Sequence, residues 1–406
     1  MDKDFQNLYY QLYLSYLEAR KNKRNTNNQL AFEIDLETNL YNLATQIHTK
    51  TYTPKPAIAF IVYKPVRREI FAADFADRVV HHLLYRCIYQ KHIDPFLIHD
   101  SYSCRKGKGT LYGVKRASYF IRSCTQNYAK NGYVLKLDIS GYFMNMSHQI
   151  LYTKVLRFLN LGISYLGLEY GVIKFLLQQT IFTNAATNCR IKGSKANWQG
   201  LPKDKSLFNK PQGYGLPIGN LTSQIFGNVY LNDLDQYIKK ELKIKYYGRY
   251  VDDMVFVHQD KNVLKNSIPH IQKELDNVGL TIHPKKTYLQ HYTKGVLFLG
   301  HYIKPYRHYI SNRTKANFYK AIQKVNTLVL QSFKIEWATM RQIRALLNSY
   351  LGILSHVKAY NLITKTTKHL CSKFYYFFGY TKTYSKTYIK KYYWQWHYTL
   401  AYPFIN

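Results

Sequence analysis

Apolar residues near the start of the chain recur with the spacing of amphipathic helices. The spacing predicts helices over residues 5–20 and 30–49. On the second helix, one face carries Leu36, Leu40, Leu43 and Ile47. A break at 53–56 precedes an apolar run over 57–63 that predicts a strand.

Further along, helical and extended patterns alternate. We expect helices from about residue 74, over 111–127, in the region up to about 183, from 221, and over 261–278 before Gly279, a typical residue just past a helix end. Residues 184–212 are polar and rich in Gly, Pro and Lys, which predicts a loop or insertion. Residues 296–310 predict a strand, a turn and a strand, and helices dominate later, over 313–331, 337–349 and 353–371.

The stretch from Tyr246 to His258 has apolar and aromatic residues on both sides of Asp252 and Asp253. The pattern predicts a β-hairpin whose tight turn carries two adjacent carboxylates. Adjacent acids in a turn are most often solvated turn formers. Inside a hydrophobic hairpin, however, unpaired carboxylates are costly to bury, which favours a bound cation.

A third carboxylate, Asp138, ends a short apolar run that predicts a buried strand over 134–137. If this strand lies beside the hairpin, Asp138, Asp252 and Asp253 meet at one edge of a sheet. Such an all-oxygen site suits Mg²⁺.

Charge indicates the class of partner. The chain has 58 Lys and Arg residues against 23 acids, a formal charge of +35, which indicates a polyanion such as nucleic acid. An AT-rich source genome would also raise the Lys content, but it does not explain the scarcity of acids. From Asn277 onward Glu336 is the only acidic residue, among 20 Lys and Arg residues interspersed with Tyr and Phe. That composition suits a phosphate backbone and stacked bases.

Other features narrow the picture. The five cysteines form no CxxC pair and are expected to be reduced thiols, and the histidines match no zinc-ligand spacing. The polar start MDKDFQN does not resemble a signal peptide, and no uncharged apolar run reaches membrane-spanning length. We expect a cytoplasmic protein without a membrane partner.

Two basic turns and a glycine-rich turn are candidate phosphate or nucleotide contacts. The first turn carries Lys64 and Arg68, and the second spans 100–114. The glycine-rich turn, 213–219, leads into a helix. Each has an ordinary alternative, because basic turns are commonly exposed and glycine turns are commonly structural.

These stretches occur in an order that resembles the successive blocks of reverse transcriptases. The blocks are a basic turn ending in DRVV, then SYSCRKGKGT, LDISGYF, GLPIGNLTSQ, YVDD, GLTIHPKKT and FLG. The resemblance covers roughly residues 55–310, with a helical region where that family has its thumb. It implies an α+β right-hand polymerase with fingers, a palm with an antiparallel sheet, and a helical thumb, acting as an RNA-directed DNA polymerase.

The resemblance also implies roles for individual residues. Two Mg²⁺ ions, for which Mn²⁺ is an acceptable substitute, would be bound by Asp138, Asp252, Asp253 and the backbone carbonyl of Ile139, with Lys286 near the leaving pyrophosphate. The remaining nucleotide contacts would be Lys64, Arg68, Arg105, Ile139, Phe143, Ile218, Gly219 and Gln224. Phe143 would screen the ribose 2′-hydroxyl, although a core aromatic is the ordinary role of a Phe. The primer grip would be Phe298, Leu299 and Gly300.

The resemblance also implies a division into domains. The fingers with the N-terminal helices span 1–132, and the palm consists of a first part over 133–160 and a second part over 213–310. Helices and a polar insertion lie between them over 161–212, and a thumb over 311–372 and a basic aromatic tail over 373–406 follow. The tail is either a strand-rich cap or a nucleic-acid contact. The sequence does not decide between the two.

One departure points to a subclass. Most bacterial reverse transcriptases begin their fourth block with Gln-Gly and end it with Ser-Pro, whereas this chain has Ile218-Gly219 and Ser223-Gln224. The form IGNLTSQ is similar to that of diversity-generating retroelement enzymes, which copy a template RNA into cDNA with errors opposite adenine. Replacing a polar Gln by Ile218 removes hydrogen bonds and loosens discrimination.

The subclass implies template RNA, a cDNA primer, dNTPs, a structured retroelement RNA and a small basic helical accessory protein as partners, in a bacterial or phage-encoded system. No maturase, endonuclease or integrase segment is recognised. The alternatives are another prokaryotic reverse transcriptase, defence-associated or group II intron-like, and a non-catalytic RNA-binding scaffold.

Overall fold

The computed structural model describes residues 2–21, 26–63, 66–160, 163, 165–331 and 335–390. Lys64 and residues 391–406 of the predicted tail lie outside the described residues. The chain forms two compact units. The first consists of Met1–Arg116 with Asn131–Gln290, and the second of Ala117–Lys130 with His291–Asn406.

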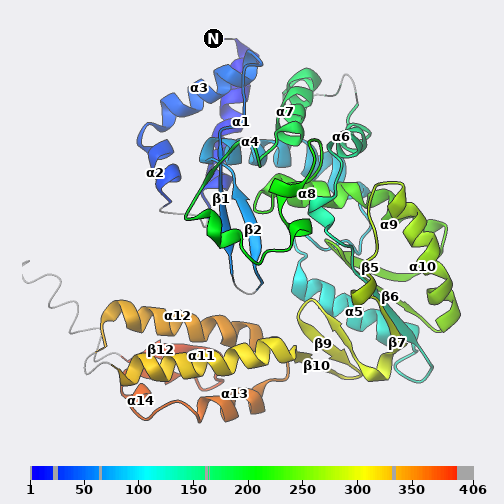
Figure 1. The fold of residues 1–406 in the computed structure, drawn as a ribbon, viewed down its shortest axis with the longest axis vertical. Helices are drawn as coiled ribbons and strands as arrows, with labels where there is room; N and C mark the ends of the chain where they lie inside the picture. Colours follow the sequence, from blue (N-terminus) through cyan, green and yellow to red (C-terminus); the bar gives the residue numbers. More distant parts are fainter. Residues whose placement is uncertain are drawn as a thin grey trace, which may run out of the picture. The chain divides into compact units, whose positions relative to one another are not determined.

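The N-terminal region of the first unit is helical (Figure 1). Helices α1 (Lys3–Ala19), α2 (Asn27–Ile34) and α3 (Leu36–His48) pack together with α4 (Phe75–Leu84). The predicted single helix over 30–49 is wrong, because Asp35 leaves the helical conformation, with φ −128° and ψ 62°. The predicted apolar face is otherwise present, since Leu40, Leu43 and Ile47 are buried.

A three-stranded sheet follows, with the order β2-β1-β4. Its strands are β1 (Ala57–Val62), β2 (Arg68–Ala72) and β4 (Cys189–Ile191), and β4 runs parallel to β1. The strand β4 lies in the stretch predicted to be a loop, and the rest of that stretch is attached to the sheet by Glu69. This buried carboxylate accepts hydrogen bonds from Trp198 Nε1, Ser206 Oγ and the Leu207 N–H at 2.6–2.7 Å.

Helices surround the centre of the first unit and share one hydrophobic core. Helix α4 continues into a π-helix, η1 (Tyr85–Ile93). The other helices of this core are α6 (His148–Leu156), α7 (Tyr170–Phe182), α8 (Leu221–Tyr230), α9 (Asn232–Lys240) and α10 (Lys261–Asp276). Helix α5 (Thr110–Cys124) contributes no residue to it, and its residues belong partly to the first and partly to the second unit.

The predicted hairpin forms one side of a four-stranded sheet with the order β5-β6-β3-β7. The strands are β3 (Tyr133–Leu137), β5 (Tyr246–Tyr250), β6 (Asp253–His258) and β7 (Tyr288–His291). Strand β6 pairs antiparallel with both β5 and β3, and α10 packs against β6 and β3 (Figure 1). The predicted hairpin and its pairing with the strand before Asp138 are therefore confirmed.

The second unit combines a small sheet with helices. Its strands β8 (Val296–Phe298), β9 (His301–Lys304) and β10 (Arg307–Ile310) form an antiparallel meander, where two strands were predicted. The helices α11 (Asn312–Leu330), α12 (Trp337–Leu354), α13 (Tyr360–Thr367) and α14 (Phe374–Phe377) follow, with a hairpin of β11 (Phe378–Tyr380) and β12 (Thr387–Ile389). No helix within the described residues has the length and apolar character to span a bilayer.

Candidate active site

The hairpin turn between β5 and β6 is conformationally unusual. Tyr250 and Asp253 are the last paired residues, so Val251 and Asp252 form the two-residue loop. Val251 has a φ of +57°, which is a genuine outlier for a β-branched side chain. A residue in this region costs about 1–3 kcal/mol and persists only where its surroundings hold it. The turn that carries Asp252 is thus held by contacts beyond its own sequence.

Three carboxylates gather at this turn. Leu137 pairs with Met254, so the register of β3 and β6 places Asp138 next to Asp253 as both strands reach the turn. Asp138 is buried, and Asp252 and Asp253 are half-buried. Burial, followed by the charges of Asp138 and Asp253, raises the pKa of Asp252 to about 6. The predicted meeting of the three acids is observed, and their negative charges repel one another.

Two lysines contact these carboxylates. Lys286 Nζ donates to both oxygens of Asp138, at 2.9 and 3.0 Å, from a short 3₁₀ turn that follows α10. Lys136 Nζ lies 2.9 Å from Asp253 Oδ1. The sequence reasoning identified Lys286 but missed Lys136. Because side chains two apart on a strand share a face, the position of Lys136 two residues before Asp138 was the available signal.

The donor set suits Mg²⁺. Within the described residues no group of three or more His, Cys, Asp or Glu side chains is arranged so that it could hold a metal ion by itself. Mg²⁺ usually keeps several waters and binds through one or two carboxylates plus substrate phosphates, so it does not need such a cluster. The site attracts cations through its negative charge. The charges of Asp138 and Asp253 raise the pKa of Asp252, and a lysine ammonium contacts each of Asp138 and Asp253. The residues fit the ion.

The sequence matches the model of a known protein family. The family model described as reverse transcriptase (RNA-dependent DNA polymerase) matches residues 67–303, which is more than half of the chain. This chain belongs to the reverse transcriptase family. The predicted α+β right-hand polymerase fold is confirmed. No curated protein matches the chain.

Solved structures of telomerases resemble this reverse transcriptase. One is apo telomerase from Candida tropicalis, at 14% identity, covering 80% of this chain and 60% of that chain with a TM-score of 0.48. Another is telomerase from Candida albicans in complex with a fragment of telomeric RNA, at 13% identity, covering 86% and 61% with a TM-score of 0.44. The chain thus spans about three fifths of the length of these structures.

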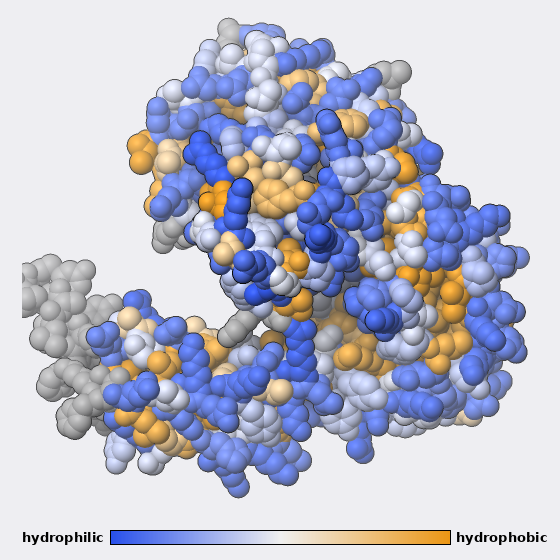
Figure 2. Space-filling model, in the orientation of Figure 1, coloured by the Kyte–Doolittle hydropathy of each residue, from blue (hydrophilic) through white to orange (hydrophobic). Residues whose placement is uncertain are grey.

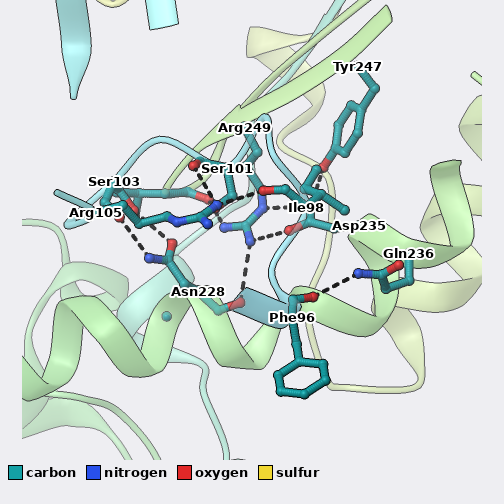
Figure 3. Close-up of polar contacts among 12 residues, drawn as sticks. Phe96, Ile98, Ser101, Ser103, Arg105, Asn228, Asp235, Gln236, Tyr247 and Arg249 are labelled. Carbon is teal, nitrogen blue, oxygen red and sulfur yellow. Dashed lines mark hydrogen bonds and ion pairs between the residues drawn. The ribbon is translucent and has the colours of Figure 1, made fainter. Parts of the chain in front are cut away.

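Arg105 requires a correction. All five N–H groups of its guanidinium have acceptors. Nε and Nη2 contact the Asp94 carboxylate, and Nη2 also contacts the Asp94 carbonyl. Nη1 contacts the Ile98 and Ser101 carbonyls (Figure 3). Its side chain is only 7% exposed. Since no donor is left for a phosphate, the predicted triphosphate contact of Arg105 is wrong, and the side chain holds its loop together instead.

Ile139 follows Asp138 directly, and Phe143 lies five residues after Asp138. Ile139 is buried and forms an isolated bridge with Ile282, while the Asp138 carbonyl accepts from the His283 N–H at 2.7 Å. Phe143 lies in a 3₁₀ turn over Tyr142–Met144, half-buried, with its ring edge facing Gly227 on α8. The roles of Ile139 as a carbonyl ligand and of Phe143 as a sugar screen stay predictions.

The fourth sequence block joins the first sheet to α8. The Ile218 carbonyl accepts from the Phe71 N–H at 2.9 Å, and its side chain packs on the small core under that sheet. Gly219 has φ +122° and lies so close to β2 that a Cβ would be 2.9 Å from Ile70, so glycine is required there. Gln224 is exposed on α8 and contacts Cys104. Their contacts with a nucleotide stay predictions.

The remaining predicted contacts are Arg68 and the primer grip, which belong to other elements than the carboxylate site. Arg68 is exposed at the start of β2, opposite Val62. In the second unit, Phe298 is buried, and Leu299 and Gly300 form the turn between β8 and β9 with φ values of 49° and 80°. The triphosphate role of Arg68 and the primer-grip role of this turn stay predictions.

Proposed function

We propose that this reverse transcriptase copies RNA into cDNA at the carboxylate site formed by Asp138, Asp252 and Asp253. The observation that carries the proposal is the convergence of these three acids, from β3 and from the β5–β6 turn, at one edge of the sheet. Two bound Mg²⁺ ions would supply activation of the primer 3′-hydroxyl and stabilisation of the leaving pyrophosphate.

Charged side chains at the site would bind the ions, and one ammonium group would move away to make room for them. Asp138, Asp252 and Asp253 would be the side-chain ligands. Lys286 occupies both oxygens of Asp138, so cation binding there requires the ammonium to move off. The displaced ammonium then lies next to the site, where a leaving pyrophosphate carries its charge. The movement of the Lys286 ammonium would thus connect the binding of the cation with the predicted role of Lys286 near the leaving pyrophosphate.

Nucleic-acid binding would rest on charge and on aromatic side chains. Figure 2 shows one face of the molecule, on which hydrophilic residues predominate and hydrophobic residues are interspersed. With a formal charge of +35, binding to a polyanion is expected to weaken steeply with salt. We assign fingers to residues 1–132, the palm to 133–160 and 213–310, and the thumb to 311–372, with 161–212 as connecting helices and insertion.

We further propose that the enzyme belongs to a diversity-generating retroelement. The support is the block GLPIGNLTSQ, in which the aliphatic Ile218 replaces a polar residue beside the nucleotide. Ile218 is half-buried and anchored through its carbonyl, so its side chain has a defined position. In this account a small basic helical accessory protein and a structured RNA complete the particle, and adenine in the template is miscopied.

The test is extension of a DNA primer on a defined RNA template with purified protein, Mg²⁺ and four dNTPs, followed by sequencing of the cDNA. We expect templated DNA with errors concentrated opposite adenine. Faithful cDNA would retain the polymerase and refute the subclass. No product, even with accessory protein and cognate RNA added, would refute the polymerase.

The variant Ile218→Gln tests the cause of the errors. It restores the polar side chain typical of other bacterial enzymes, and we expect fewer errors opposite adenine with unchanged errors opposite the other bases. Ile70→Val, a neighbouring change in β2 that leaves Ile218 intact, is the control. An error spectrum that is the same in both variants would refute a role for Ile218.

A further inference from the structure

Arg249 is the largest fully buried side chain of the described residues, and it lies two residues before Val251. Its Nε and Nη2 atoms donate to the two oxygens of Asp235 on α9, at 2.8 and 2.5 Å, and both side chains are fully buried (Figure 3). Tyr247 donates to the same carboxylate at 2.6 Å. The charge of Arg249 is therefore neutralised by a fixed partner in the core.

The remaining edge of the guanidinium faces the turn. Arg249 Nη1 donates to the Val251 carbonyl at 2.9 Å. That carbonyl belongs to the peptide that joins Val251 to Asp252, so the bond fixes the plane of this peptide. Because Val251 is held at φ +57°, the peptide would otherwise relax toward an ordinary conformation and turn Asp252 away from Asp138.

The backbone of Arg249 is held as well. Its N–H donates to the Asp100 carbonyl at 2.8 Å, and its carbonyl accepts from the Tyr102 N–H at 2.9 Å. Tyr102 is also packed against Gly248, where an added Cβ would lie 2.1 Å from the tyrosine oxygen. The strand that leads into the turn is thus fixed from the loop side and, through Asp235, from the helix side.

We propose that Arg249 is a positioning residue for the metal-binding turn, holding the Val251 carbonyl so that Asp252 faces Asp138. The proposal rests on the proposed function in that the turn is taken to bind the catalytic ions. Arg249 touches neither substrate nor ion in this account, and it acts through the peptide before Asp252. Its effect should therefore appear in ion affinity before it appears in RNA binding.

The test compares Arg249→Lys with Tyr247→Phe. Both variants disturb the contacts of Asp235, but only the first removes the bond to the Val251 carbonyl, because a single ammonium cannot span Asp235 and the turn. Two quantities are measured: the Mg²⁺ concentration that gives half-maximal primer extension, and Mn²⁺ binding without nucleotide, followed by electron paramagnetic resonance. We expect Arg249→Lys to weaken both at least about tenfold and Tyr247→Phe to leave both within about twofold of wild type.

A second variant guards against misfolding. Arg249→Met combined with Asp235→Leu removes both buried charges together, which avoids leaving either one unpaired. It also removes the bond to the turn, so the same loss of Mn²⁺ affinity is expected in a folded protein. Retained affinity in this double variant would overturn the proposal.

The outcomes separate this proposal from the polymerase assignment. If wild type makes cDNA and Arg249→Lys binds Mn²⁺ as Tyr247→Phe does, the positioning role is wrong and the polymerase stands. If wild type makes no DNA but Arg249→Lys alone loses Mn²⁺ affinity, the positioning role stands and the polymerase fails. If wild type binds no Mn²⁺, the positioning role is overturned.

Discussion

The correction at Arg105 leads to a quantitative prediction. In Arg105→Lys, one ammonium replaces five N–H donors, so it retains part of the contact with Asp94 and leaves the Ser101 carbonyl without a partner, while the Ile98 carbonyl keeps the Ser101 N–H. Each buried acceptor left unsatisfied costs about 1–3 kcal/mol. Asp94 is 33% exposed and regains water, so we add little for it. With one acceptor left unsatisfied, the expected loss in free energy of unfolding is about 1–3 kcal/mol.

The assay is urea unfolding at constant pH, together with the KM for dNTPs in primer extension. Arg105→Lys should unfold at lower urea with KM unchanged within about twofold, because the side chain has no donor left for a phosphate. Arg68→Lys is the matched control. Because Arg68 is exposed at the start of β2, this variant should keep the free energy of unfolding of the wild type, while its KM for dNTPs rises. A raised KM together with unchanged stability in Arg105→Lys would refute the reasoning.

Three further predictions follow from individual contacts. Burial, helped by the charge of Asp74, raises the pKa of Asp77 to about 7, and it outweighs the hydrogen bond from Tyr52, which lowers the pKa. The folded state therefore binds a proton that the unfolded state releases, and stability should fall by about 3 kcal/mol from pH 5 to pH 8. Asp77→Asn should reduce the slope in urea unfolding by this amount, while the part due to Asp252, with its pKa of about 6, remains. An unchanged slope would contradict the role of Asp77. Gly248→Ala should destabilise by about 1–3 kcal/mol because its Cβ meets the Tyr102 oxygen, whereas Gly352→Ala, which meets nothing within 4 Å, should stabilise α12 by up to about 1 kcal/mol. Equal unfolding midpoints for the two variants would count against the clash. Phe143→Ala should admit ribonucleotides in primer extension, and unchanged sugar selectivity would contradict its role.

The sequence predicts the parts of this fold that depend on local periodicity. The apolar runs on either side of Asp252 specify a hairpin, and the run before Asp138 specifies a third strand of the same sheet, so the pattern alone brings the acids together. The apolar face at Leu40, Leu43 and Ile47 was predictable for the same reason. These patterns repeat within a few residues, and burial of one face is sufficient to fix them.

The parts that were missed depend on contacts between distant residues. Strand β4 consists of three residues in a polar stretch, and only its pairing with β1 makes it a strand. Arg105 looked like a phosphate ligand because a basic loop is normally solvated, whereas Asp94 and two carbonyls enclose it. Arg249 carries no signal of burial beyond its place between tyrosines in an apolar hairpin, and its partner Asp235 is fourteen residues away.

The central claim is that the three carboxylates at the β5–β6 turn carry RNA-templated DNA synthesis. Asp252→Asn keeps the shape of the side chain and removes its charge, and Glu241→Gln, at an exposed position after α9, removes a charge elsewhere. The measurement is the single-turnover rate of primer extension on RNA, with RNA affinity measured alongside. We expect Asp252→Asn to lose at least about a thousandfold in rate, equal to about 4 kcal/mol of transition-state stabilisation, with RNA affinity and the Glu241→Gln rate unchanged. A rate near wild type in Asp252→Asn would contradict the account.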